Sequence, residues 1–202
     1  MKSSDKIIAL IPAYNEQEYI AEVILSTTKY LPVLVLDDGS TDGTRQWLRK
    51  VEGQNGIRVF SHETNQGKGA AIRRGVEQAR GDIILIQDAD LEYDPEEYNI
   101  LLKPVVNGFA DVVYGSRFMG GKPHRILFFW HSIGNKFLTF LSNMFTNLNL
   151  TDMETCYKVF KSNVIKSIHI EENRFGFEPE ITAKVAELAR DNKVKLYEVG
   201  IS

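Results

Sequence analysis

The sequence lacks the features that are typical of secreted and membrane-spanning proteins. Its 202 residues include one cysteine, Cys156, which excludes an intramolecular disulfide and suits a reducing compartment. No apolar run approaches the ~18 residues that a membrane-spanning helix needs. Polar residues follow Met1 before the first apolar segment, so we expect no signal peptide and a cytoplasmic location, peripheral to the inner face of a membrane at most.

Long basic runs, internal repeats and low-complexity segments are also absent. The formal net charge is −3, which excludes a protein that binds nucleic acid through bulk positive charge. Apolar residues, by contrast, are plentiful: 43% of the chain is hydrophobic, which is enough for one sizeable core or two small ones.

The first ~115 residues alternate between short apolar runs, which predict strands, and segments with helical spacing, which predict helices. The runs are continuously apolar, as in strands that are buried on both faces. We expect strands at 6–12, 33–36, 57–61, 82–87 and 111–115, and helices at 17–30, 41–52, 65–80 and from 94 onward. This alternation predicts an α/β fold with a mostly parallel central sheet and helices on both faces.

Four of the expected strands end in residues that suit ligand binding. These endings are Pro12-Ala13-Tyr14, Asp37-Asp38, Asp88-Ala89-Asp90 and Gly115-Ser116-Arg117. In sheets of this kind ligands bind beyond the carboxyl ends of the strands. We therefore expect these residues to converge on one site.

Asp88 and Asp90 are the most informative of these residues. The apolar run 83–86 leads directly into them, so a buried strand delivers two carboxylates to one edge of the sheet. A divalent cation removes their mutual repulsion, and oxygen ligands suit Mg²⁺ or Mn²⁺. Because such ions take further ligands from substrate phosphates, the pair predicts an enzyme with a phosphorylated donor. A surface turn without a ligand is the alternative.

The chain after Arg117 has a different character. Glycine and proline predict a loop over 118–125. Residues 125–149 are rich in aromatic and aliphatic side chains and predict one or two amphipathic helices with an apolar surface. Beyond them, residues 152–161 predict a strand, 178–192 a helix and 194–201 a last strand.

Five motifs appear in order: Ile11–Glu16, Asp37–Thr44, Asn65–Gly69, Asp88–Asp90 and Gly115–Arg117. In these motifs the chain resembles the inverting family 2 glycosyltransferases, which have the GT-A fold. It is most similar to the dolichyl- and polyprenyl-phosphate hexosyltransferases, such as dolichyl-phosphate mannosyltransferase. The resemblance implies metal-dependent, inverting transfer of a hexose from a nucleoside-diphosphate sugar, GDP-mannose or UDP-hexose, to a polyprenyl phosphate.

The resemblance also implies roles for individual residues. Asp88, Asp90 and Glu92 would hold the Mg²⁺ or Mn²⁺ ion. The residues implied for the nucleotide sugar are Pro12, Tyr14, Glu16, Asp37, Asp38, Lys68 and Asp88, with Asp38 favoured over Asp37. The residues implied for catalysis are Asp90, Arg117, Asp152 and Lys158.

Structural roles remain open for several of these residues. Asp37 or Asp38 would also suit the cap of a turn. The alternative for Lys68 is a solvated lysine at the start of a glycine-rich helix. The alternative for Arg117 is a surface salt bridge. His131, on the apolar stretch, would suit an acceptor phosphate or an ordinary core or surface position.

The acceptor is less well defined than the donor. Residues 152–158 match the prenyl-phosphate relatives only in part, and Lys158 stands where those relatives have Arg, so a charge is kept but bidentate geometry is lost. A phosphate acceptor is already ionised and needs no general base. A saccharide hydroxyl needs one, for which Asp152, Glu154 and Glu178 are candidates, although Glu178 at a helix start also suits the helix dipole.

The apolar stretch 127–145 is expected to rest at a membrane interface, or else to pack in the core or in a homodimer. The resemblance implies a single domain, in which residues 1–117 bind the nucleotide sugar and 118–202 face the acceptor. Since relatives usually continue with a basic and aromatic segment, we expect the chain to be truncated at its C-terminus. The alternative functions are transfer to a saccharide hydroxyl and non-catalytic binding of a nucleotide sugar.

Overall fold

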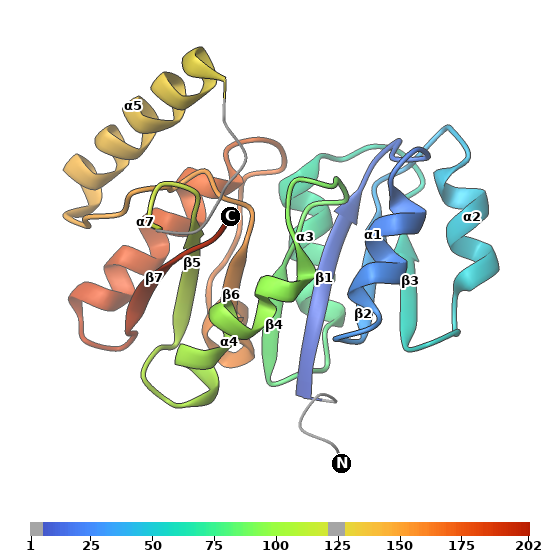
Figure 1. The fold of residues 1–202 in the computed structure, drawn as a ribbon, viewed down its shortest axis with the longest axis horizontal. Coiled ribbons are helices and arrows are strands. Elements are labelled where there is room, and N and C mark those ends of the chain that lie inside the picture. Colours follow the sequence, from blue (N-terminus) through green and yellow to red (C-terminus); the bar gives the residue numbers. More distant parts are fainter. Residues whose placement is uncertain (1–5, 121–127) are drawn as a thin grey trace.

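The computed structural model describes residues 6–120 and 128–202, in which seven strands form one sheet (Figure 1). The strands are β1 (Ile7–Ala13), β2 (Val33–Asp37), β3 (Ile57–Ser61), β4 (Ile83–Ile86), β5 (Val112–Ser116), β6 (Lys158–Lys161) and β7 (Leu196–Gly200). Their order across the sheet is β3-β2-β1-β4-β6-β5-β7. All the expected strands are present, and only β6 differs substantially in length from its prediction.

All strands of this sheet except β6 run in the same direction. β1 pairs in parallel with β2 and β4, β2 with β3, and β5 with β7. β6 lies antiparallel between β4 and β5. The prediction of a mostly parallel sheet is therefore confirmed, and the carboxyl ends of β1, β2, β4 and β5 meet at one edge.

Helices cover both faces of the sheet, as the sequence predicts. They are α1 (Ile20–Thr27), α2 (Thr44–Val51), α3 (Lys68–Gln78), α4 (Tyr98–Val106), α5 (Phe129–Thr146), α6 (Ser162–Ser167) and α7 (Phe177–Arg190), with a short 3-10 turn, η2, at Pro95–Glu97. Figure 1 shows α1 and α4 in front of the sheet and α3 behind it. The hydroxyl groups of Thr27 on α1 and Tyr98 on α4 lie 3.1 Å apart, which joins the two front helices.

The strand expected over 152–161 forms only over its last four residues. Before it, the carboxylate of Glu198 accepts hydrogen bonds from the N–H groups of Thr151 (2.8 Å) and Asp152 (3.0 Å). The backbone at residues 151 and 152 is thus bound to a side chain instead of a neighbouring strand, and β6 begins at Lys158. The prediction also missed α6, because six residues are too few to show a helical period.

The apolar stretch expected over 125–149 forms the single helix α5, which lies beside α7 at one end of the molecule (Figure 1). Residues 121–127 lie outside the described residues, and with them most of the loop expected over 118–125. None of the helices that the structure describes is both long enough and apolar enough to cross a membrane.

The polarity of α5 is the reverse of that of an ordinary surface helix. Asn135, Thr139 and Asn143 point toward the protein, where they form hydrogen bonds with the segment 150–153. The large apolar side chains instead face outward. Those between 59% and 79% exposed are Phe128, Phe129, Trp130, Phe137, Phe140, Met144 and Phe145.

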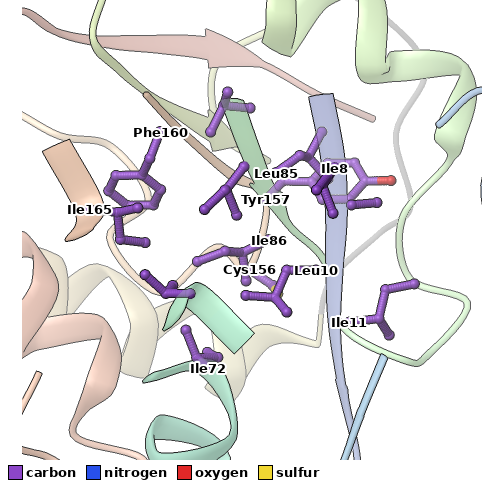
Figure 2. Close-up of a cluster of buried hydrophobic side chains, with 14 of the residues drawn as sticks. Ile8, Leu10, Ile11, Ile72, Leu85, Ile86, Cys156, Tyr157, Phe160 and Ile165 are labelled. Carbon is purple, nitrogen blue, oxygen red and sulfur yellow. The ribbon is translucent and has the colours of Figure 1, made fainter. Parts of the chain in front are cut away.

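The hydrophobic core packs α3 against the middle of the sheet. Figure 2 shows part of it, in which Leu10 of β1 points toward Ile72 of α3. Gly75 lets the helix come this close, because a Cβ atom there would lie 2.3 Å from Cδ1 of Leu10. This packing brings the N-terminus of α3 to the carboxyl edge of the sheet, next to the ends of β1 and β4.

Candidate active site

A pocket of about 610 Å³ opens at the carboxyl edge of the sheet. Its walls come from the ends of β1, β2 and β4, from the start of α3 and from the segment before α7. The expected site residues that line it are Pro12, Tyr14, Glu16, Asp38, Lys68, Asp88 and Asp90. The structure therefore brings together residues from four of the five motifs.

Glu16, Asp88 and Asp90 concentrate negative charge in this pocket. Burial and the neighbouring charges of Asp88 and Glu92 raise the pKa of Asp90 above its ordinary value. Burial also raises the pKa of Glu16, and the charges of Asp90 and Asp88 add to this effect. The neighbouring negative charges make ionisation of Glu16 and Asp90 less favourable, so this edge of the sheet favours a bound cation.

Lys68, the first residue of α3, offsets part of this charge. Its Nζ lies 3.0 Å from Oδ1 of Asp88 and 2.8 Å from Oε1 of Glu178, at the start of α7. Burial by itself lowers the pKa of this amine, but neighbouring groups that include Asp88 and Glu178 raise it above its ordinary value. Lys68 is thus a charged link between Asp88 and α7, and it is not the solvated lysine that the sequence left open.

Asp37 and Asp38 hold the backbone around the pocket. Asp38 accepts hydrogen bonds from the N–H groups of Gln66 (2.9 Å) and Gly67 (2.7 Å), which fixes the turn before α3. Asp37 is buried and pairs with Nε of Arg45 at 2.6 Å. Of the two, only Asp38 lines the pocket.

Arg117 and Asp152 form a bidentate ion pair. Nε and Nη2 of Arg117 lie 2.8 and 3.0 Å from the two carboxylate oxygens, and Asn135 of α5 donates a further hydrogen bond of 2.9 Å to Asp152. Burial works to raise the pKa of Asp152, but the guanidinium holds it below its ordinary value. Asp152 is fully buried, so this is not the surface salt bridge that the sequence left open for Arg117.

Lys158 lies in the protein interior and does not line the pocket. Its side chain is 1% exposed, its Nζ donates to the carbonyl oxygen of Thr155, and the amine lies 4.9 Å from the centre of the Tyr114 ring. Burial lowers the pKa of this amine. The structure therefore gives no support to Lys158 as a phosphate-binding residue of this pocket.

Glu92 differs from Asp88 and Asp90 in the partner of its side chain. Its carboxylate faces Nη1 of Arg117 at 4.0 Å, and it does not line the pocket. Among residues 6–120 and 128–202, no group of three or more His, Cys, Asp or Glu side chains is placed to hold a metal ion. The three expected metal ligands, Asp88, Asp90 and Glu92, are therefore not arranged around one ion position in this structure.

Asp88 and Asp90 nevertheless suit a hard divalent cation. Asp90 accepts a hydrogen bond from the N–H of Glu92 (3.1 Å), and no ion pair within the described ranges involves it. Two carboxylate ligands from the protein are enough to bind Mg²⁺, because this ion keeps several water ligands and takes others from phosphates. The chemistry of this donor set therefore fits an ion that arrives with a phosphorylated ligand.

The three candidates for a general base differ in their partners. Asp152 is paired with Arg117, and Glu178 is paired with Lys68. Glu154 is half-buried and forms no ion pair in the part of the chain that the structure describes. Burial, and then the charge of Glu178, raises the pKa of Glu154, which is the direction that a general base needs.

Sequence reasoning missed three residues that line the pocket: Asn65, Arg174 and Phe175. Asn65 belongs to the third motif but received no role. Arg174 and Phe175 precede α7, far along the chain from the other pocket residues. Gly67 and Gly69 could have signalled this approach, since glycine is the usual residue where the backbone must come close to another group.

Comparisons with known proteins agree with this geometry. The family model of glycosyl transferase family 2 matches residues 8–168. The UDP-N-acetylglucosamine–dolichyl-phosphate N-acetylglucosaminyltransferase of Methanococcus voltae is 27% identical, over 98% of this chain and 86% of the relative. The undecaprenyl-phosphate mannosyltransferase of Micrococcus luteus is 30% identical, over 92% of this chain and 79% of the relative.

A solved structure shows the same fold. Glucosyl-3-phosphoglycerate synthase from Mycobacterium tuberculosis, in complex with Mn²⁺, uridine diphosphate and phosphoglyceric acid, superposes with a TM-score of 0.76 at 22% identity. The match covers 98% of this chain and 69% of the synthase chain. The chain therefore belongs to glycosyl transferase family 2, and it is a glycosyltransferase with the GT-A fold.

Proposed function

We propose that this glycosyltransferase transfers a hexose from a nucleoside-diphosphate sugar to a polyprenyl phosphate, with inversion and with a divalent cation. One observation carries the proposal: Asp88 and Asp90 stand together in a pocket at the carboxyl edge of the sheet. The relatives from Methanococcus voltae and Micrococcus luteus, whose names give dolichyl phosphate and undecaprenyl phosphate as acceptors, support the acceptor class.

The pocket suits a nucleotide sugar in size and lining. Its volume of about 610 Å³ lies within the range of about 300–1,000 Å³ that is usual for small-molecule sites. Tyr14 is 43% exposed and offers its ring to the face of a base. Glu16 would accept hydrogen bonds from ribose hydroxyls, with Pro12 and Asp38 beside it.

Asp88 and Asp90 would hold Mg²⁺ or Mn²⁺ together with oxygens of the donor diphosphate. When bound, the cation would neutralise the charge of the departing diphosphate. The mycobacterial synthase, which holds Mn²⁺ and uridine diphosphate in the same fold, supports this assignment. Lys68, at 3.0 Å from Asp88, holds that carboxylate in place.

Arg117 would bind the phosphate groups of the donor or of the acceptor. Two of its nitrogens are occupied by Asp152, and Nη1 remains directed toward Glu92. A guanidinium held in this way is pre-organised for a phosphate oxygen. Asp152 then acts as a positioning residue for Arg117 and not as a base.

The ion pairs formed by two of the three candidates for a general base favour a phosphate acceptor. Asp152 and Glu178 are both engaged with cations, which leaves Glu154 as the remaining candidate. An ionised phosphate attacks without a general base, so this arrangement is sufficient for a polyprenyl phosphate. A saccharide hydroxyl would instead require Glu154.

α5 would bring the enzyme to a lipid acceptor. Its outward side chains are aromatic and aliphatic, and its residues include no acidic side chain and one lysine, Lys136. A helix of this kind lies in the membrane interface with its apolar face buried among the lipids. A homodimer that covers the same face is the alternative occupant.

Replacement of Asp90 tests the metal and the donor together. We expect calorimetric titration of the wild-type protein to show Mn²⁺-dependent binding of one of GDP-mannose, UDP-glucose and UDP-N-acetylglucosamine. Asp90→Asn should weaken that binding by at least about tenfold, because a charge-assisted ligand of the cation is lost. The matched control is Asp94→Asn, which alters the carboxylate that caps η2 outside the pocket. Equal, metal-independent binding in all three proteins would contradict the assignment.

Replacement of Glu154 tests the acceptor class. Glu154→Gln should transfer sugar to polyprenyl phosphate at nearly the wild-type rate, measured as radiolabelled glycolipid product. Loss of a general base typically costs about 10²–10⁴-fold in rate. A loss of that size in Glu154→Gln would show that transfer depends on Glu154 as a base, and a wild-type protein that forms no glycolipid from polyprenyl phosphate would argue against the phosphate acceptor.

Replacement of Asp152 tests the ion pair that positions Arg117. Asp152→Asn should lower the free energy of unfolding at neutral pH by about 3–5 kcal/mol, because a largely buried guanidinium loses its fully buried partner. The folded state lowers the pKa of Asp152 below its ordinary value of 3.8, so its contribution is complete above that value and is lost as the pH falls through the folded pKa. Denaturant titrations should therefore show the difference between the two proteins shrinking below about pH 4.

The control for this experiment is Asp191→Asn. It removes an exposed ion pair of 2.8 Å with Lys193, which should change stability little. Equal stability of Asp152→Asn and the wild-type protein at neutral pH would show that the pair does not hold Arg117 in place.

Replacement of the exposed aromatic residues tests membrane contact. The double variant Phe129→Ser, Trp130→Ser should sediment with phosphatidylglycerol-containing vesicles at least about tenfold less than the wild-type protein, because two large apolar side chains no longer enter the lipid. Phe109→Ser is the control, since Phe109 is 59% exposed but lies outside α5. Absence of vesicle binding, together with a dimer that the double variant disrupts, would favour the homodimer.

A further inference from the structure

One wall of the pocket is formed by the segment 171–176, which leads into α7. Arg174 and Phe175 of this segment line the pocket together with residues that follow β1 and β4. Phe175 is 85% exposed, and Arg174 is also exposed. Neither residue belongs to the motifs that define the rest of the site.

The wall is fixed to the N-terminus of α3 by backbone contact. The N–H of Ala70 donates to the carbonyl oxygen of Asn173 (3.1 Å). A Cβ atom on Gly69 would lie 2.2 Å from the carbonyl oxygen of Glu172, and one on Gly67 would lie 2.2 Å from that of Asn173. Only glycine permits this approach, because backbone atoms cannot move aside as a flexible side chain can.

Side chains strengthen the same attachment. Arg73 of α3 donates to the carbonyl oxygen of Ile170 (3.0 Å) and to Oδ1 of Asn173 (2.8 Å). Glu180 of α7 accepts hydrogen bonds from the N–H groups of Glu171 and Glu172 at 2.7 and 2.9 Å. The segment is therefore held from both sides, and the backbone of Arg174 has a defined place in the wall.

The charges of the pocket make Arg174 chemically distinct. Its cationic lining residues are Lys68 and Arg174. Lys68 is shared between Asp88 and Glu178, whereas no ion pair within residues 6–120 and 128–202 involves Arg174. Its guanidinium thus retains its hydrogen-bonding capacity in a pocket whose other charged lining groups are the paired Lys68 and four carboxylates, those of Glu16, Asp38, Asp88 and Asp90. An anionic ligand that enters with a divalent cation would meet one further positive group there.

We propose that Arg174 binds a phosphate oxygen of the nucleoside-diphosphate donor, and that Gly67 and Gly69 position it. The inference rests on the proposed function for the identity of the donor. The planar guanidinium supplies two parallel N–H donors to a phosphate, which an ammonium group cannot do. Gly67 packs against Cγ of Arg174, so the aliphatic part of the side chain is supported while its end reaches the ligand.

Removal of the charge is the first test. Calorimetric titration of GDP and of UDP, each with Mn²⁺, should show about 10- to 100-fold weaker binding to Arg174→Gln than to the wild-type protein, for whichever nucleotide the wild type binds. Arg174→Lys should recover part of this loss, because it keeps the charge without the bidentate geometry. Arg49→Gln, on the exposed face of α2, is the matched control and should bind as the wild type does.

Displacement of the wall is the second test. Gly69→Ala should weaken nucleotide binding by a similar factor, since its Cβ atom pushes Glu172 and the wall away from α3. The double variant Gly69→Ala, Arg174→Gln should bind the nucleotide as tightly as the single variant with the lower affinity. The two effects do not add, because both changes remove the same contact. Thermal unfolding identifies any variant that fails to fold, and Arg174→Gln then decides the question alone.

The outcomes separate this inference from the proposed function. If the wild-type protein binds neither nucleotide, the proposed function fails and the inference fails with it. If the wild type binds and Arg174→Gln binds equally well, the inference is overturned and the function stands.

Discussion

Repulsion between carboxylates at one edge of the sheet is the constraint on which the rest of the site depends. The parallel pairing of β1 with β4 brings Glu16, Asp88 and Asp90 to the same pocket. Nothing in their mutual interaction favours this arrangement, and burial raises the pKa of both Glu16 and Asp90. The buried strands impose it, so the stability of the core maintains a site that attracts positive charge.

Two cations from the first part of the chain, Lys68 and Arg117, are each held by a carboxylate from the later part. Glu178 of α7 holds Lys68, and Asp152 holds Arg117. Buried ion pairs of this kind add little net stability, because desolvation offsets most of their attraction. Their effect is geometric: each fixes the direction in which a long, flexible side chain points. The second part of the chain thereby sets the orientation of residues that the first part supplies.

The sequence was sufficient to predict the sheet and the edge at which the site forms. Continuous apolar runs that end in polar residues, such as the run before Asp88, specify both a buried strand and the place where it opens to solvent. The roles of Asp152 and Lys158 could not be predicted in this way. Both are charged residues in one short segment, yet one is paired with Arg117 and the other is buried in the core, and the difference depends on tertiary contacts.

Arg174 illustrates a second limit of sequence reasoning. It has no apolar run before it and no neighbour of known chemistry, so its local sequence carries no sign of a site. Its place in the pocket depends on Gly67 and Gly69, which allow two backbone segments from opposite parts of the chain to touch. The pocket therefore draws its lining from both parts of the chain, since Arg174 and Phe175 line it together with residues before 118.

The reversed polarity of α5 connects the outer surface to the site by a short hydrogen-bonded path. Asn135 of α5 donates to the same carboxylate, that of Asp152, which fixes Arg117. A helix with its polar side chains turned inward cannot tilt or shift without disturbing these bonds. If a lipid surface holds the apolar face of α5, the same contact restrains Asp152 and hence the guanidinium of Arg117. The surface that would receive a lipid acceptor and the group that would bind its phosphate are thus mechanically joined through one buried carboxylate.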